Sequence, residues 1–67
     1  MKLFFDEIKP FVGDTKCCQI FLDENYTTYF GTIYFEERVT FSWSTSVEFL
    51  TESQMQQILS FIRQNKE

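Results

Sequence analysis

The groups in this 67-residue chain that are capable of nucleophilic or acid–base chemistry are two adjacent cysteines and several pairs of neighbouring acids. The chain has no histidine, so neither a Ser-His-Asp nor a Cys-His catalytic arrangement is available. To act as a nucleophile, Cys17 or Cys18 would need another base or an electropositive setting. A free cysteine is more often a small buried hydrophobe than a catalytic thiol. Neighbouring side chains on a strand point to opposite faces, so a bridge between the two would be strained, and we interpret both as reduced thiols of a cytoplasmic protein.

The acidic pairs Asp6-Glu7, Asp23-Glu24 and Glu36-Glu37 carry the carboxylates that a cation site or an acid–base pair would use. Two of these pairs fall in expected turns, whereas catalytic carboxylates need a concave, partly desolvated setting. We therefore interpret them as solvated turn residues. Adjacent cysteines without histidine or a second cysteine pair do not make a tetrahedral zinc site. The sequence predicts no enzyme, no metal and no cofactor.

The composition predicts a single small, acidic domain over residues 1–67. Hydrophobic residues make up 43% of the chain and aromatic residues 19%, which indicates a folded core rather than disorder. The formal net charge is −4 and the six basic residues are scattered, a pattern that disfavours direct nucleic-acid binding. No apolar run is long enough to span a membrane, and Asp6-Glu7 interrupts the N-terminal one, so we expect neither a span nor a signal peptide.

A C-terminal helix over residues 52–65 is the clearest predicted element. Thr51 and Gln54 have the spacing of a capping box, in which the side chains at the first turn bond each other's backbone N–H groups. Glu52 suits the positive end of the helix dipole and Arg63 the negative end. The apolar stripe has helical spacing and consists of Met55, Ile58, Leu59 and Ile62.

The N-terminal segment also has helical spacing of its apolar residues, which are Phe4, Phe5, Ile8, Phe11 and Val12. Pro10 removes a backbone donor and crowds the preceding turn, so the predicted helix is kinked there. The alternative is a short strand followed by a helical turn. Gly13 is placed to end the helix in a left-handed conformation.

Between these helices lie three runs rich in aromatic and β-branched residues, at 16–22, 26–35 and 38–49. The connections between them are short, which predicts a three-stranded antiparallel meander. The predicted fold class is therefore α+β, with the order helix, strand, strand, strand, helix.

The register follows from a three-residue loop at 23–25 and a tight turn at 36–37. It predicts an inner face composed of Cys18, Ile20, Leu22, Phe30, Tyr34, Val39, Phe41, Trp43 and Val47. An odd-length connection at Glu36-Glu37 would exchange the two faces of the middle strand. The outer face is too apolar to be exposed only to solvent. Either the N-terminal helix covers it, or both helices share the inner face and the outer one is left open for a partner.

These features favour a protein-binding module, and more narrowly an inhibitor or immunity-type protein, such as a phage or mobile-element product, that blocks a basic surface of a nucleic-acid-handling enzyme. The predicted apolar contacts are Phe21, Tyr29, Ile33 and Phe35, with Glu24, Glu36 and Glu37 at the rim. On this hypothesis Ile33→Glu removes partner binding and leaves the fold intact. The alternative is a structural homodimer that uses the same face, because a short chain gains stability by self-association.

Overall fold

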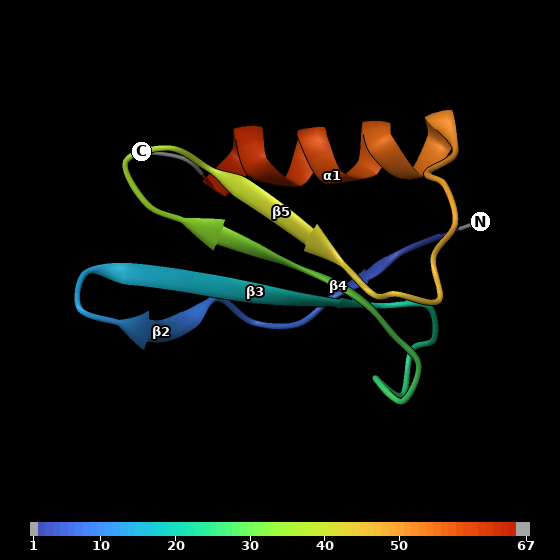
Figure 1. Cartoon of the computed structure of the whole chain (residues 1–67), viewed down its shortest axis with the longest axis horizontal. Helices are drawn as coiled ribbons and strands as arrows, with labels where there is room; N and C mark the ends of the chain where they lie inside the picture. Colours follow the sequence, from blue (N-terminus) through green and yellow to red (C-terminus); the bar gives the residue numbers. More distant parts are fainter. Residues whose placement is uncertain (1, 66–67) are drawn as a thin grey trace.

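One antiparallel sheet of five strands and one α-helix make up the described part of the chain, residues 2–65, in a computed structural model (Figure 1). Neighbouring strands follow the order β1-β3-β4-β5, and β2 also pairs with β3. Along the chain the elements are β1 (Phe4–Phe5), β2 (Lys9–Val12), β3 (Thr15–Phe21), β4 (Tyr29–Phe35), β5 (Thr40–Trp43) and α1 (Glu52–Asn65).

The N-terminal segment is the main correction to the predicted fold. Instead of a helix it forms β1 and β2, which both pair antiparallel with the long strand β3. Pro10, which would cost a helix one hydrogen bond, lies in β2 at the edge of the sheet, where a missing N–H is tolerated. Gly13 has a φ of 57° and lies in the turn between β2 and β3, so its left-handed conformation closes a hairpin rather than a helix.

The C-terminal helix is confirmed at its predicted bounds. The Gln54 backbone N–H donates to the Thr51 hydroxyl at 3.1 Å, and the Thr51 N–H donates to Oε1 of Gln54 at 3.0 Å, which is the reciprocal pattern of a capping box. Ile58 is buried, but Met55 and Leu59 are exposed, so the stripe that faces the sheet is rotated from the predicted one. The helix is too short to cross a membrane, and the described residues hold no other.

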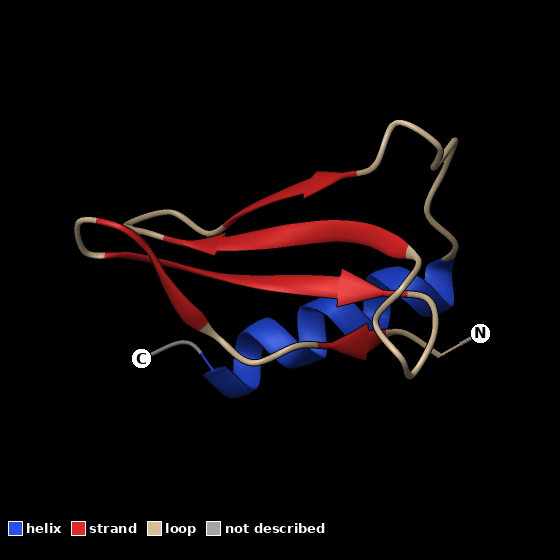
Figure 2. Ribbon diagram, turned by 90° about the horizontal axis from the view of Figure 1, so that it is seen from below, coloured by secondary structure: helices blue, strands red, loops and turns tan. Residues whose placement is uncertain are grey.

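The helix covers one face of the sheet, as Figure 2 shows with the strands in front of it. Against this face pack Leu3 from the N-terminal segment and Phe5 of β1, whose ring stacks on Phe61 of the helix with centroids 4.3 Å apart. The Leu3 backbone N–H also donates to the Gln57 side chain at 2.7 Å. The buried core cluster consists of Leu3, Ile20, Phe30, Ile33 and Ile58.

Strand β4 presents the opposite faces from those predicted. Tyr34 pairs with Thr40 and Ile33 with Phe41, so the connection between β4 and β5 has odd length. The register between β3 and β4 is shifted as well, with Ile33 opposite Cys18. Because side chains alternate along a strand, Ile33 and Phe35 turn toward the helix and Tyr34 turns away from it. The predicted faces of β3 and β5 are correct, since Ile20 and Phe41 lie on the core side.

A bulge at Phe30 sets the direction of the first residues of β4. Ile20 pairs with Gly31, but Phe21 pairs with Tyr29, which leaves Phe30 as an extra residue. Phe30 is thereby directed into the core, where it is 2% exposed, and Tyr29 to the other face. Strict alternation from Gly31 would have placed these two side chains the other way round.

Candidate protein-binding face

The face of the sheet that α1 leaves uncovered carries a row of aromatic side chains, and we call it the open face. The strand register places them there, because paired residues share a face of the sheet. Phe4 pairs with Phe21, on the opposite face from Phe5, and Tyr34 pairs with Cys17 on the same face as Phe21. The Phe11 ring lies against Tyr34, which assigns it to the same face. The rings of the open face are Phe4, Phe11, Phe21, Tyr29 and Tyr34, with Tyr26 on the loop at its edge.

Two ring clusters occupy this face. In the first, Phe21 makes edge contacts with Tyr26 and Tyr29, at centroid distances of 5.4 and 6.0 Å. The hydroxyl of Tyr29 shares a short hydrogen bond with that of Thr32, which fixes the direction of its ring. The second cluster is the edge contact of Phe11 with Tyr34 at 5.2 Å. The rings therefore contact each other at their edges. Phe11, Tyr26 and Tyr29 nevertheless remain 58%, 45% and 39% exposed.

The loop between β3 and β4 holds Tyr26 in an unusual backbone conformation. Its φ is 57°, a left-handed value that bulky side chains rarely adopt. Asp23 organises the loop, because its carboxylate accepts from the Thr27 N–H at 3.0 Å, the Thr28 N–H at 2.8 Å and the Thr27 hydroxyl. These bonds, led by that of the Thr27 side chain, hold the pKa of Asp23 below its ordinary value. The strained residue is thus the one that brings an exposed ring onto Phe21.

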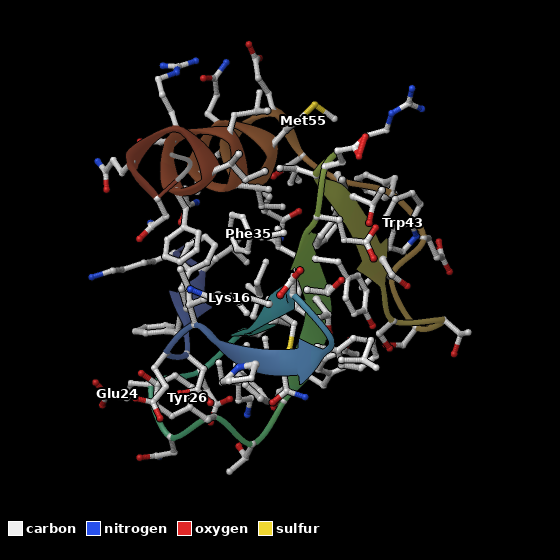
Figure 3. All side chains as sticks on the ribbon, turned by 90° about the vertical axis from the view of Figure 1, so that its left-hand side faces the viewer. Lys16, Glu24, Tyr26, Phe35, Trp43 and Met55 are labelled. Carbon is white, nitrogen blue, oxygen red and sulfur yellow. The ribbon has the colours of Figure 1, made fainter. Side chains whose placement is uncertain are left out.

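The structure brings Phe21, Tyr29 and Glu24, three of the predicted interface residues, to the same end of the open face. Phe21 and Tyr29 are in contact, and Glu24 lies in the adjoining loop, where Figure 3 shows it beside Tyr26. Glu24 is exposed next to this aromatic cluster, and its part in binding stays a prediction.

The other predicted interface residues lie elsewhere. Ile33 has no exposed surface and belongs to the core, and Phe35 packs against that core on the helix side. The prediction placed both residues on the outer face, and it was wrong because the two faces of β4 are exchanged. Glu36 and Glu37 lie in the connection after β4, where they line a hollow of about 360 Å³ together with Lys16 and Phe35. Figure 3 shows Lys16 and Phe35 close together at this end of the molecule.

Phe4, Phe11, Tyr26 and Tyr34 are the residues of the open face that sequence reasoning missed. Phe4 and Phe11 were assigned to a helix, although Pro10 is also a signal for an edge strand. Tyr34 was assigned to the core by an even-length turn. Tyr26 was placed as the first residue of a strand, and no sequence pattern signals a left-handed tyrosine.

The two cysteines are free and buried. Burial, and to a lesser degree the nearby Asp6 carboxylate, raises the pKa of Cys18 to about 11, so its thiol is protonated at neutral pH. That thiol donates to the backbone carbonyl of Asp6 at 3.1 Å. Among residues 2–65, no group of acids and cysteines is placed to hold a metal ion.

Comparisons with known proteins do not supply a relative for this chain: no family model, no curated protein and no solved structure matches it.

Proposed function

We propose that this chain is a protein-binding module whose contact surface is the open face. The observation that carries the proposal is the position of the helix, which covers one face of the sheet and leaves the aromatic rings of the other without cover from residues 2–65. Contiguous apolar surface of this kind marks interaction sites in small proteins. Tyrosine and phenylalanine are also the side chains that are enriched at the centres of protein interfaces.

The strained loop supports the same proposal. A left-handed tyrosine has an unfavourable backbone energy, and the surrounding structure must hold it in place. Here Asp23 holds the loop, and the result is that the Tyr26 ring is presented next to Phe21 with 45% of its surface exposed. The contact with Phe21 only about offsets the backbone strain, so a contact surface gives the stronger reason for an exposed tyrosine at that position.

Charge favours a partner with a basic surface. The chain has a net charge of −4, and acids adjoin both ends of β4, with Asp23 and Glu24 before it and Glu36 and Glu37 after it. Such a distribution attracts lysine- and arginine-rich surfaces, and arginine also binds favourably over exposed aromatic rings. The narrower proposal is an inhibitor that occupies a basic, nucleic-acid-binding surface of an enzyme in the cytoplasm. Free cysteines support the cytoplasmic location.

Affinity capture with matched variants tests this proposal. The immobilised chain is compared with Tyr29→Ser, which alters the open face, and with Phe49→Ser, which removes a 73% exposed ring elsewhere. We expect a partner that is retained by the chain and by Phe49→Ser, is lost with Tyr29→Ser, and is released by rising salt. Equal retention by all three proteins, or loss only with Phe49→Ser, would contradict the proposal.

A homodimer formed through the open face must be distinguished from the binding of a different protein. In the case of the homodimer, Tyr29→Ser lowers the solution mass of the purified chain from dimer to monomer, and no second protein is needed. The heteromeric proposal instead predicts that Tyr29→Ser changes partner retention without changing the solution mass.

A further inference from the structure

The two edges of the sheet differ in their protection against pairing with another chain. One edge is formed by β1, which has only two residues, and by β2, which carries Lys9, Pro10 and an irregular register next to it. Lysine, proline, irregularity and short length are the features that prevent edge-to-edge pairing. The other edge is β5, with the sequence Thr-Phe-Ser-Trp. It is as short as β2, but it carries neither lysine nor proline and its register with β4 is regular.

The backbone of β5 offers unpaired groups at this edge. The Ser44 N–H donates to the Phe30 carbonyl at 2.8 Å, in the same register that pairs Ser42 with Thr32. Backbone groups of alternate residues point to opposite sides of a strand, so those of Phe41 and Trp43 point away from β4. No strand within residues 2–65 pairs with that side of β5.

Exposed apolar side chains adjoin the edge on the helix side of the sheet. The flank of the helix that carries Gln57 faces the N-terminal segment, as its bond to Leu3 shows, so Met55 and Leu59 lie on the flank toward β5. Each is 47% exposed, and Trp43 of β5 is 50% exposed. Figure 3 shows Met55 and Trp43 on the same side of the molecule, away from Tyr26.

Electrostatics limits where two copies of this chain can meet. Two molecules that each carry a net charge of −4 repel one another over most of their surface. Residues 39–47, which include β5, form a continuous stretch without any charged side chain. Of the two edges of the sheet, this one therefore meets the lesser repulsion on self-association, because the segment of β1 and β2 carries Asp6, Glu7 and Lys9.

We propose that β5 is a self-association edge, on which β5 of a second copy pairs antiparallel about a two-fold axis at Ser42. In this register, Phe41 of each copy exchanges backbone hydrogen bonds with Trp43 of the other. The Phe41 and Trp43 rings then adjoin each other on the helix side, extended by Met55 and Leu59 of both copies. Because the axis is perpendicular to the sheet, both open faces point in the same direction, and the dimer presents two copies of the proposed contact surface.

Engineered cysteines test the register directly. At the axis, Ser42 faces Ser42 of the second copy as a non-hydrogen-bonded pair with Cα atoms about 4.5 Å apart, within the range of a disulfide. Thr40 is the matched control, because it lies on the same strand and face but opposite Ser44 of the second copy. Under mild oxidation we expect Ser42→Cys to form a disulfide-linked dimer and Thr40→Cys to stay monomeric. Cross-linking by neither variant, or equally by both, would overturn the proposal.

Solution mass across a concentration series tests the association without cross-linking. We expect a reversible dimer that strengthens with salt, since screening weakens the repulsion between copies. Ser42→Lys places two ammonium groups opposite each other at the axis and should raise the dimer dissociation constant at least tenfold, whereas Thr40→Lys should change it by less than threefold. Circular dichroism checks that both variants keep the native fold. A monomeric chain at all concentrations, or a dimer that Tyr29→Lys disrupts and Ser42→Lys does not, would overturn the assignment to β5.

Discussion

Both faces of the sheet are rich in aromatic rings, but within residues 2–65 only one of them is covered by another element. On the covered face, Phe30 and Ile33 are buried beneath the helix, and Phe5 stacks on Phe61. On the open face the rings touch one another edge to edge, and less than two thirds of the surface of Tyr26 and Tyr29 is covered. The covered face therefore accounts for the fold, and the open face retains apolar surface that a partner can bury.

This difference follows from the size of the chain. A domain of about 60 residues buries only about 60% of the surface that its unfolded form exposes, so one helix and one sheet complete a single core. The N-terminal segment lies in the plane of the sheet as β1 and β2, and for that reason it does not cover the second face. Additional aromatic residues beyond those that the core needs must then remain at the surface.

The largest expected effect is that of a charge on the covered face. Ile33→Glu places a carboxylate among apolar side chains at a site with no exposed surface, and should lower the free energy of unfolding by more than about 4 kcal/mol. The burial of Ile33 thus overturns the expectation from the sequence that Ile33→Glu leaves the fold intact. Thr40→Glu, on an exposed site of the neighbouring strand, should stay within about 0.5 kcal/mol of the parent chain. Urea unfolding followed by circular dichroism measures both, and similar losses would contradict the assignment of faces.

A methyl group between β4 and β5 should produce the next largest effect. A Cβ at Gly31 would lie 2.7 Å from the Ser42 carbonyl oxygen and 2.8 Å from the Phe41 ring. Gly31→Ala must therefore separate the two strands or displace the ring, which should cost about 1–3 kcal/mol of unfolding free energy. Thermal unfolding measures the loss. An unchanged melting temperature would mean that Phe41 does not pack over Gly31.

How much of this arrangement can be predicted from the sequence depends on the range of the interactions involved. The helix start is predictable because the capping bonds join Thr51 and Gln54, only three residues apart. The faces of β4 are not, because one extra residue in either connection exchanges them. The bonds of Asp23 to Thr27 and Thr28 set a longer loop than the three-residue one expected at residues 23–25.

The candidate site was predictable only in part, for the same reason. An apolar excess beyond one core is visible in the composition, and Phe21 lies on the predicted face because β3 faces as expected. Tyr29 reaches the open face through the bulge at Phe30, which no turn motif signals. The helical spacing of the N-terminal apolar residues is satisfied equally by two short strands that pair with β3, and Pro10 decides against the helix.

A smaller effect on stability is expected on the open face. Tyr26→Gly relieves the left-handed backbone, worth about 1 kcal/mol, and loses an edge contact with Phe21 worth about 0.5–1.5 kcal/mol. The free energy of unfolding should therefore change by less than about 1 kcal/mol, while partner retention falls severalfold. Urea unfolding and affinity capture measure the two quantities. A large loss of stability with full retention would assign Tyr26 to the fold rather than to the contact surface.

The smallest effect is the pH dependence that Asp23 contributes. Its pKa is lowered in the folded chain by the bonds from Thr27 and Thr28, so its stabilisation is present above the unfolded pKa of about 3.9. That stabilisation is lost as the pH falls from this value through the lower, folded pKa. Asp23→Asn should reduce the change of the unfolding free energy with pH in this acidic range. At neutral pH the unfolding of this variant should begin in the loop before β4. An identical acid profile in both proteins would mean that the carboxylate does not hold the loop.

Site-specific photo-cross-linking tests the central claim most directly, since it records which face touches the partner. A benzophenone side chain is introduced at Tyr29 on the open face or at Gln56 on the exposed side of the helix, and irradiated in the presence of the captured partner. We predict a covalent adduct with the partner from position 29 and none from position 56. Adducts from position 56 alone would contradict the account, because they would place the partner on the helix and leave the open face without a role.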